Sequence, residues 1–201
     1  MEETDTELFE AWRGGDARSG SRLVERHFAS VFRFFRSKVG VEAEELTQNT
    51  FLGCVEARAR FTEGSSFRAY LFGIARNHLL RFFEGRGRGL PADVLTQRSV
   101  ADLSPSPSRL AASKQEAQRL LEALQHIPVD SQVAIELVYW EGMPLADVAE
   151  VLEIPKGTVK SRLHRARGQL HEVLQDLGEE PDALEVRARL LKRAINDCSS
   201  R

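Results

Sequence analysis

Basic side chains without acidic neighbours mark one helical stretch near the end of the chain. From Lys156 to Arg167 the sequence contains no Asp or Glu. Lysine and arginine neutralise phosphates and donate hydrogen bonds to guanine acceptors, and a serine hydroxyl bonds either kind of base-edge group. Apolar residues at helical spacing would turn the basic side outward. The apolar side comprises Val159, Leu163, Ala166 and Leu170, and the basic side Lys156, Lys160, Arg162, Arg165 and Arg167.

A second amphipathic helix is predicted just before this stretch. Leu145, Val148, Ala149 and Leu152 follow the spacing i, i+3, i+4, i+7, which puts them on one helical face. Pro155 cannot continue that helix, and Gly157 and Thr158 can open the next one. Two short helices around a tight break are typical of a helix-turn-helix, whose second helix enters the major groove of DNA.

A polar helical face lies in the first half of the chain. A helix is predicted from about residue 43 to residue 60, with Phe51, Cys54 and Val55 turned inward. Its outward side is acidic and amide-rich, but it contains a leucine that a solvated face does not need. We therefore consider both a solvated surface and a partner-binding surface. This outward side comprises Glu45, Gln48, Asn49, Leu52 and Glu56.

The helix predicted from residue 67 to residue 84 combines an aromatic, an amide and arginines on one side. Tyr70, Gly73, Asn77 and Arg81 recur at i, i+3, i+7, i+11. A glycine inside a helix costs up to ~1 kcal/mol relative to alanine, but it lets a base or backbone approach closely. Stacking, hydrogen bonding to bases and charge neutralisation are what single-stranded nucleic acid requires. A solvated basic helix is the alternative.

Helical periodicity runs through nearly all 201 residues, and no alternating strand pattern is convincing. We predict an all-α protein of two small helical domains joined by a flexible linker, followed by a C-terminal helix. Glycine, proline and serine enrich the linker. The first domain spans residues 1–86, the linker 87–113, the helix-turn-helix domain 114–177 and the helical extension 178–201.

Composition excludes several functional classes. The net charge of −2 means that affinity for nucleic acid must come from local basic faces. The acidic start is unlike a signal peptide, and no apolar run approaches the ~20 residues that span a bilayer, so we expect a cytoplasmic protein without membrane insertion. Cys54 and Cys198 are expected to be free thiols. No metal-ligand spacing, nucleophile–base pair or phosphate loop is visible, so no metal, cofactor, catalytic residue or enzymatic activity is predicted.

Three motifs together resemble one protein family. EELTQNTFL at 44–52 and FRAYLFGIARN at 67–77 resemble conserved region two of bacterial RNA polymerase sigma factors, and IPKGTVKSRLHRAR at 154–167 resembles region four. With just these two domains and a linker, the chain looks like the extracytoplasmic-function (ECF) group of the sigma-70 family. The resemblance implies a factor that binds core RNA polymerase and directs promoter-specific initiation. It also implies an anti-sigma factor as a partner.

The resemblance assigns roles to particular residues. Core RNA polymerase would bind the helical face that comprises Glu45, Gln48, Asn49, Leu52 and Glu56. The loop of residues 61–66 and the face around Asn77 would capture a flipped non-template base of the minus-ten element. Duplex and single-stranded promoter DNA are therefore both implied ligands. The minus-ten set is Phe61, Ser65, Ser66, Tyr70, Arg76, Asn77 and Arg81.

The resemblance also implies how the upstream promoter element is read. Lys160, Ser161, His164 and Arg165 share one helical face and would contact base edges of the minus-thirty-five element. Lys156, Arg162 and Arg167 would hold phosphates, so their contribution should weaken as salt rises.

Departures from the family pattern keep two alternatives open. Asn49 replaces a usual acid, Gly53 and Cys54 replace a usual basic and apolar pair, and Gln132 replaces a common basic residue. The neutral amide of Asn49 and the mid-helix Gly53 would weaken or retune the polymerase contact. One alternative is a sigma-like decoy that binds an anti-sigma factor. The other is a stand-alone helix-turn-helix regulator. The extension, with Leu184, Ala188, Leu191, Ile195 and Cys198 on one face, would either pack on the second domain or mask a surface.

Overall fold

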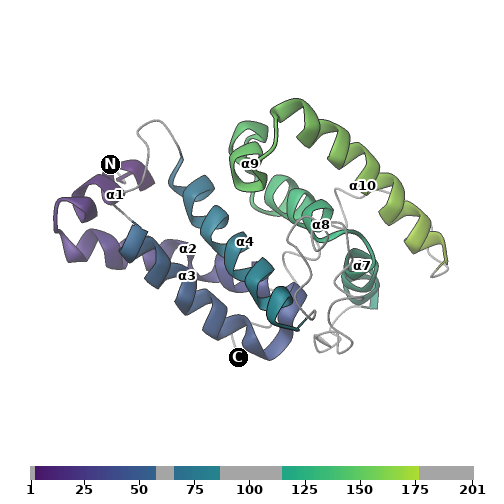
Figure 1. Ribbon diagram of the computed structural model, residues 1–201, viewed down its shortest axis with the longest axis horizontal. Coiled ribbons are helices and arrows are strands. Elements are labelled where there is room, and N and C mark those ends of the chain that lie inside the picture. Colours follow the sequence, from purple (N-terminus) through teal and green to yellow (C-terminus); the bar gives the residue numbers. More distant parts are fainter. Residues whose placement is uncertain (1–2, 58–65, 87–114, 177–201) are drawn as a thin grey trace.

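The computed structural model describes residues 3–57, 66–86 and 115–176, and its regular elements there are all helical (Figure 1). This confirms the predicted fold class. The first unit comprises α1 (Asp5–Arg13), α2 (Ala17–Val39), η1 (Gly40–Glu42), α3 (Ala43–Ala57) and α4 (Phe67–Arg86). The second comprises α7 (Gln115–Gln125), α8 (Val129–Ile135), the π-helical turn η3 (Glu136–Trp140), α9 (Leu145–Leu152) and α10 (Lys156–Asp176). The predicted C-terminal helix lies outside the described residues.

Local signals explain where the first helices begin and how closely they cross. Thr4 caps α1 in a capping box with Glu7, so Asp5 is free to pair with α2 instead of acting as the cap. The Asp5 carboxylate lies 2.8 Å from Nε2 of the buried His27. At Gly20, an added Cβ would lie 2.5 Å from the Trp12 ring, so α1 and α2 approach each other at a glycine.

Phenylalanines form most of the first unit's core. Phe9, Phe35, Phe67, Phe72 and Phe83 are fully buried, and they come from α1, α2 and α4. Cys54 is also buried, as predicted, and burial raises the pKa of its thiol to about 12. The inward placement of Val55 was wrong. Val55 is 41% exposed, because its position on α3 turns it toward the same side as Leu52.

The helix-turn-helix is confirmed, with its turn built by one unusual residue. Glu153 ends α9 in the left-handed conformation, at φ 55°, and its N–H donates to the carbonyls of Ala149 and Glu150. Pro155 follows, and α10 begins directly after it. Val148, Leu152, Val159 and Leu163 bury the contact between the two helices, in agreement with the predicted periodicity.

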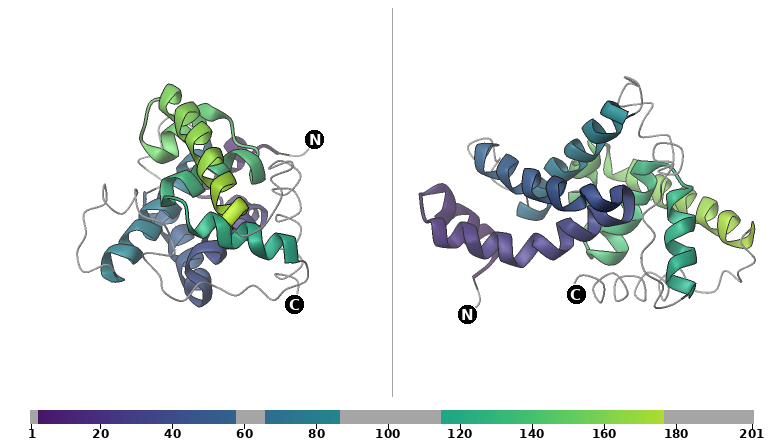
Figure 2. Two further views of the ribbon diagram at one scale, coloured as in Figure 1. Left: turned by 90° about the vertical axis from the view of Figure 1, so that its right-hand side faces the viewer. Right: turned by 90° about the horizontal axis from the view of Figure 1, so that it is seen from below.

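The two units pack against each other along α4 and α9. They lie side by side in Figure 1 and in the right-hand view of Figure 2, and α2 also contacts α7. The linker composition permitted either a compact or a splayed arrangement, and the structure has the compact one. Within the described residues, no helix is long and apolar enough to span a bilayer.

Candidate nucleic-acid and polymerase interfaces

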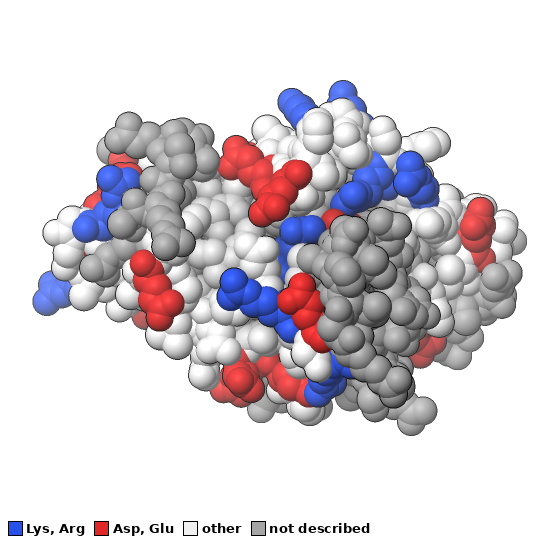
Figure 3. Space-filling model, viewed as in Figure 1, with Lys and Arg blue, Asp and Glu red and all other residues white. Residues whose placement is uncertain are grey.

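The outer face of α10 exposes the predicted minus-thirty-five readers. Lys160, Ser161, His164 and Arg165 are all exposed, because the buried residues of α10 occupy its other side. The Ser161 hydroxyl donates a hydrogen bond to the carbonyl of Gly157 at 3.2 Å. Its oxygen can still accept a hydrogen bond from a donor group on a base. In Figure 3, Lys and Arg side chains gather over the part of the molecule where α10 lies.

The predicted phosphate-binding residues are not all equally available. Lys156 and Arg167 are exposed. Arg162 retains 26% of its side-chain exposure, and its guanidinium donates to Asp130 of α8 at 2.7 Å. Arg162 is therefore held against its own domain in this conformation.

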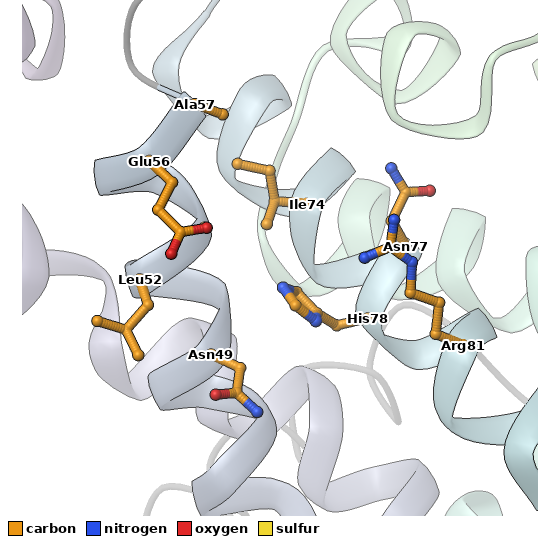
Figure 4. A pocket seen from close by; sticks show the side chains of 9 residues that line it. Asn49, Leu52, Glu56, Ala57, Ile74, Asn77, His78 and Arg81 are labelled. Carbon is orange, nitrogen blue, oxygen red and sulfur yellow. The ribbon is translucent and has the colours of Figure 1, made fainter.

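A groove of about 490 Å³ separates α3 from α4 on the first unit. Ile74 and His78 project from α4 into this groove toward α3 (Figure 4). Burial, reinforced by the charge of Arg81, lowers the pKa of His78, so its ring is neutral near pH 7. The lining residues are Asn49, Leu52, Gly53, Glu56, Ala57, Ile74, Asn77, His78 and Arg81.

Gly53 lies where α3 faces Ile74 and His78 of α4 with little room for a side chain, so the position favours glycine. A Cβ at this position would lie 3.0 Å from Cγ2 of Ile74 and 3.4 Å from Nε2 of His78. The glycine therefore lets α3 and α4 approach closely. The sequence suggested that Gly53 alters the polymerase contact, and in the structure Gly53 is one of the residues that line the groove. Neither Gly53 nor His78 was among the predicted site residues, because their relation to Asn77 depends on how two helices pack.

The structure brings only part of the predicted minus-ten set to the groove. Asn77 and Arg81 are exposed and line it. Tyr70 is half-buried; its ring lies 5.8 Å from that of Phe9, and its hydroxyl donates to the carbonyl of Cys54 at 3.4 Å. The Ser66 hydroxyl accepts from the N–H of Ala69 at the start of α4. Phe61 and Ser65 lie outside the described residues.

Arg76 occupies an unexpected place for a predicted DNA contact. It is 7% exposed, and its Nε and Nη2 donate to the two carboxylate oxygens of Asp130 at 2.9 and 3.0 Å. The expectation that Arg76 is an accessible DNA contact therefore does not hold in this conformation. The reason is that α4 carries Arg76 on the side that packs against the second unit.

The predicted polymerase face of α3 is open to solvent. Glu45, Gln48 and Glu56 are exposed, Asn49 is half-buried, and Leu52 is 58% exposed. Val55 adds a second exposed apolar side chain to this helix. Asn49, Leu52 and Glu56 also line the groove, so this face and the groove share one edge.

Comparisons with known proteins match both helical units of the chain. Residues 23–89 match the family described as Sigma-70 region 2, and residues 117–170 match Sigma-70, region 4. The RNA polymerase sigma-H factor of Pseudomonas aeruginosa is 29% identical over 192 residues, covering 89% of this chain and 98% of that protein. The ECF RNA polymerase sigma factor SigE of Mycolicibacterium smegmatis is 31% identical over 180 residues, covering 86% and 68%.

Solved structures show the same likeness. The sigma factor RpoE, in complex with the anti-sigma factor NepR from Bartonella quintana, aligns with a TM-score of 0.60 and 26% identity, covering 77% of this chain and 96% of that one. CnrH, in complex with the cytosolic domain of CnrY, aligns with a TM-score of 0.59 and 24% identity over 84% of this chain and 96% of that one, which shows a shared fold.

Proposed function

The chain belongs to the ECF group of the sigma-70 family of bacterial RNA polymerase sigma factors, and we propose that it binds core RNA polymerase and directs promoter-specific transcription initiation. Sigma factors are transcription initiation factors. We further propose that the chain acts in the cytoplasm and has no enzymatic activity of its own.

One observation carries this proposal: the chain has two different surfaces suited to nucleic acid. The groove between α3 and α4 offers Asn77 and Arg81 beside the apolar Leu52 and Ile74. The exposed face of α10 offers Lys160 and Arg165. A groove with an amide and an arginine suits an unstacked base, and a basic helical face suits the major groove of a duplex. Promoter opening requires both ligands at once.

In this proposal the first domain, residues 1–86, captures the separated strand. Taking a base out of the duplex stack costs a few kcal/mol. A hydrogen bond contributes roughly 0.5–1.5 kcal/mol net, so polar contacts in the groove would offset part of that cost. Opening is then a shift of population toward the separated strand and needs no chemical step. The Asn77 amide would hydrogen-bond to the base, and Arg81 would neutralise the backbone.

The second domain, residues 114–177, would hold the upstream duplex. Lys160 and Arg165 suit guanine acceptors, while Ser161 and His164 offer less selective contacts. Lys156 and Arg167 would fix the register on phosphates. Because phosphate contacts release counterions, promoter affinity should fall steeply as salt rises.

The exposed face of α3 is the proposed polymerase contact. Leu52, 58% exposed, and Val55, 41% exposed, lie one turn apart on α3 and form a small apolar patch that a partner could cover. We propose an anti-sigma factor as a second partner, by analogy with the RpoE complex. The accessible basic face of α10 argues against a pure decoy, which needs no DNA contact. The α3 face and the groove argue against a stand-alone helix-turn-helix regulator.

Binding to core polymerase tests the proposal at its first step. Leu52→Arg places a charge on the proposed interface and should weaken co-elution with purified core polymerase at least tenfold. Ala29→Arg adds the same charge at an exposed position of α2 and is the matched control. Equal binding by the two variants would show that the α3 face does not contact the polymerase. Failure of the unaltered chain to bind core polymerase would overturn the proposed function.

A further inference from the structure

One histidine on the groove between α3 and α4 has no part in the proposed function so far. His78 projects from α4 toward α3 (Figure 4), and its ring hydrogen-bonds the backbone of Asn49. The same ring lines the groove, and its neighbour in the chain, Asn77, lines it too. His78 is therefore held by the protein on one side and faces the space that a ligand would enter on the other.

The glycine at position 53 leaves the imidazole room to reach α3. A Cβ there would lie 3.4 Å from Nε2 of His78 and 3.0 Å from Cγ2 of Ile74, so a side chain would crowd this contact. Asn49 and Gly53 both depart from the family pattern, in which an acid and a basic residue are usual. In the structure both positions lie against the His78 ring, so the two departures meet at one side chain.

The ring presents a hydrogen-bond acceptor at neutral pH. Burial lowers the pKa of His78 and the charge of Arg81 lowers it further, although the Asn49 hydrogen bond and the charge of Glu56 oppose this shift. The ring therefore carries a single proton near pH 7. The Asn49 bond favours the charged ring, so the ring N–H is the donor and the Asn49 carbonyl the acceptor. The other ring nitrogen then has a free lone pair.

The remaining lining residues suit a base better than a phosphate. Leu52 and Ile74 offer apolar contact to the face of an uncharged ring. The Glu56 carboxylate lines the same groove and would repel a phosphate that approached Arg81. A base taken out of its stack is read by hydrogen bonds along its edge, and an imidazole nitrogen in the lining can make such a bond.

An acceptor nitrogen distinguishes the bases by one exocyclic group. Adenine carries an amino donor at C6 and cytosine one at C4, whereas guanine and thymine carry keto oxygens at these positions. These groups project beyond the ring, so a lining side chain meets them before it meets the ring N–H groups. A neutral imidazole nitrogen would bond the amino group and repel the keto oxygen. The Asn77 amide can donate or accept, so it does not make this distinction by itself.

We infer that His78 is a specificity-determining residue of the strand-capture groove: its ring, positioned by the Asn49 carbonyl and by the space at Gly53, selects adenine or cytosine at one position of the unpaired promoter strand. This inference rests on the proposed function and names the class of base that the groove takes. A histidine that only packed α3 against α4 would give no such base preference.

Competition among pre-opened promoter templates tests the inference. Heteroduplex templates built on a promoter recovered with the unaltered chain and core polymerase would vary one unpaired non-template base at a time, with the template strand unchanged. The unaltered chain should favour adenine and cytosine over guanine and thymine at least fivefold at one position. Because all four templates compete in one reaction, a general loss of activity cancels in their ratio.

Three variants separate base selection from folding. His78→Ala should bring that ratio to within twofold while binding to core polymerase and the preferences at other positions stay unchanged. His78→Gln supplies both a donor and an acceptor, so it should also lose the preference but transcribe better than His78→Ala. His126→Ala makes the same substitution at an exposed histidine of the second domain and should keep the preference.

The contradicting outcomes are distinct. Equal use of all four bases by the unaltered chain, or the same preferences in His78→Ala, would overturn the inference and leave the proposed function intact. A preference for guanine or thymine that disappears in His78→Ala would also overturn it, because the ring would then act as a donor. If the unaltered chain directs no specific start site, the proposed function fails and the inference fails with it.

Discussion

Arg76 and Asp130 lie 54 positions apart in the sequence, yet the Arg76 guanidinium donates hydrogen bonds to both carboxylate oxygens of Asp130, at 2.9 and 3.0 Å. The pair joins a helix proposed to capture single-stranded DNA to the helix that supports the helix-turn-helix. It couples the accessibility of Arg76 to the relative position of the two domains. Any DNA contact by Arg76 therefore follows domain separation.

The exposed face of α10 should control promoter recognition without affecting polymerase binding. A good contact from lysine or arginine to a base edge is worth about 1–3 kcal/mol. Lys160→Ala and Arg165→Ala should each reduce transcription from a cognate promoter on the order of tenfold, with core binding unchanged. Arg18→Ala removes an exposed arginine from α2 and should change neither. Loss of core binding in the α10 variants would contradict the assignment.

The groove between α3 and α4 should contribute to opening more than to duplex binding. Asn77→Ala removes an amide at the groove and leaves Leu52 and Ile74 in place. Closed-complex formation should stay within twofold, while strand separation, followed by permanganate reactivity of unpaired thymines, should fall at least fivefold. A comparable loss in closed-complex formation and in strand separation would show that Asn77 has no specific role in strand capture.

The crossing of α1 and α2 should not tolerate a methyl group at Gly20. An added Cβ would lie 2.5 to 2.7 Å from atoms of the Trp12 ring, which is buried and cannot move aside cheaply. Overpacking of this kind costs about 1–3 kcal/mol. Gly20→Ala should therefore lower the free energy of unfolding, measured by urea denaturation.

Gly168→Ala supplies the control for that substitution. Gly168 lies exposed within α10, and a Cβ added there would meet nothing within 4 Å. Replacing a helical glycine by alanine should stabilise the protein by up to ~1 kcal/mol. Destabilisation of similar size at both positions would show that the Trp12 contact is not the cause.

The buried His27 should make stability fall at acidic pH. Burial lowers the pKa of His27 below its ordinary value of 6.5, although the charge of Asp5 opposes this shift. The unfolded chain therefore binds more protons than the folded chain once the pH falls below about 6.5, and the free energy of unfolding decreases. Above that pH the contribution is constant.

His27→Gln isolates this effect, because His78 also has a lowered pKa and remains in both proteins. Urea denaturation between pH 7.5 and pH 5.5 should show a smaller loss of stability for the variant. Parallel pH profiles for the two proteins would exclude His27 as a source of the acid sensitivity.

Periodicity within single helices predicted much of this molecule. The basic face of α10 and the polar face of α3 were predicted because each depends on the spacing of residues along one helix. The same reasoning placed Asn77 and Arg81 on one side of α4, where they line the groove.

The remaining features depend on contacts between distant parts of the chain. The spacing of α4 puts Arg81 on the face of Tyr70 and Asn77 and Arg76 off it, but it does not show that Asp130 of the second unit covers Arg76. Tyr70 looked like a free stacking platform, but its ring packs near Phe9. Gly53 lines the groove because α3 packs against α4, where Ile74 lies close to the Gly53 backbone. Helical spacing identifies a face, and tertiary packing decides what covers it.

Transcription by purified core RNA polymerase from a library of promoter fragments, with and without the chain, tests the central claim most directly. We predict discrete start sites that appear only with the chain, preceded by two shared sequence elements at a fixed spacing. Start sites that are the same with and without the chain would contradict the account.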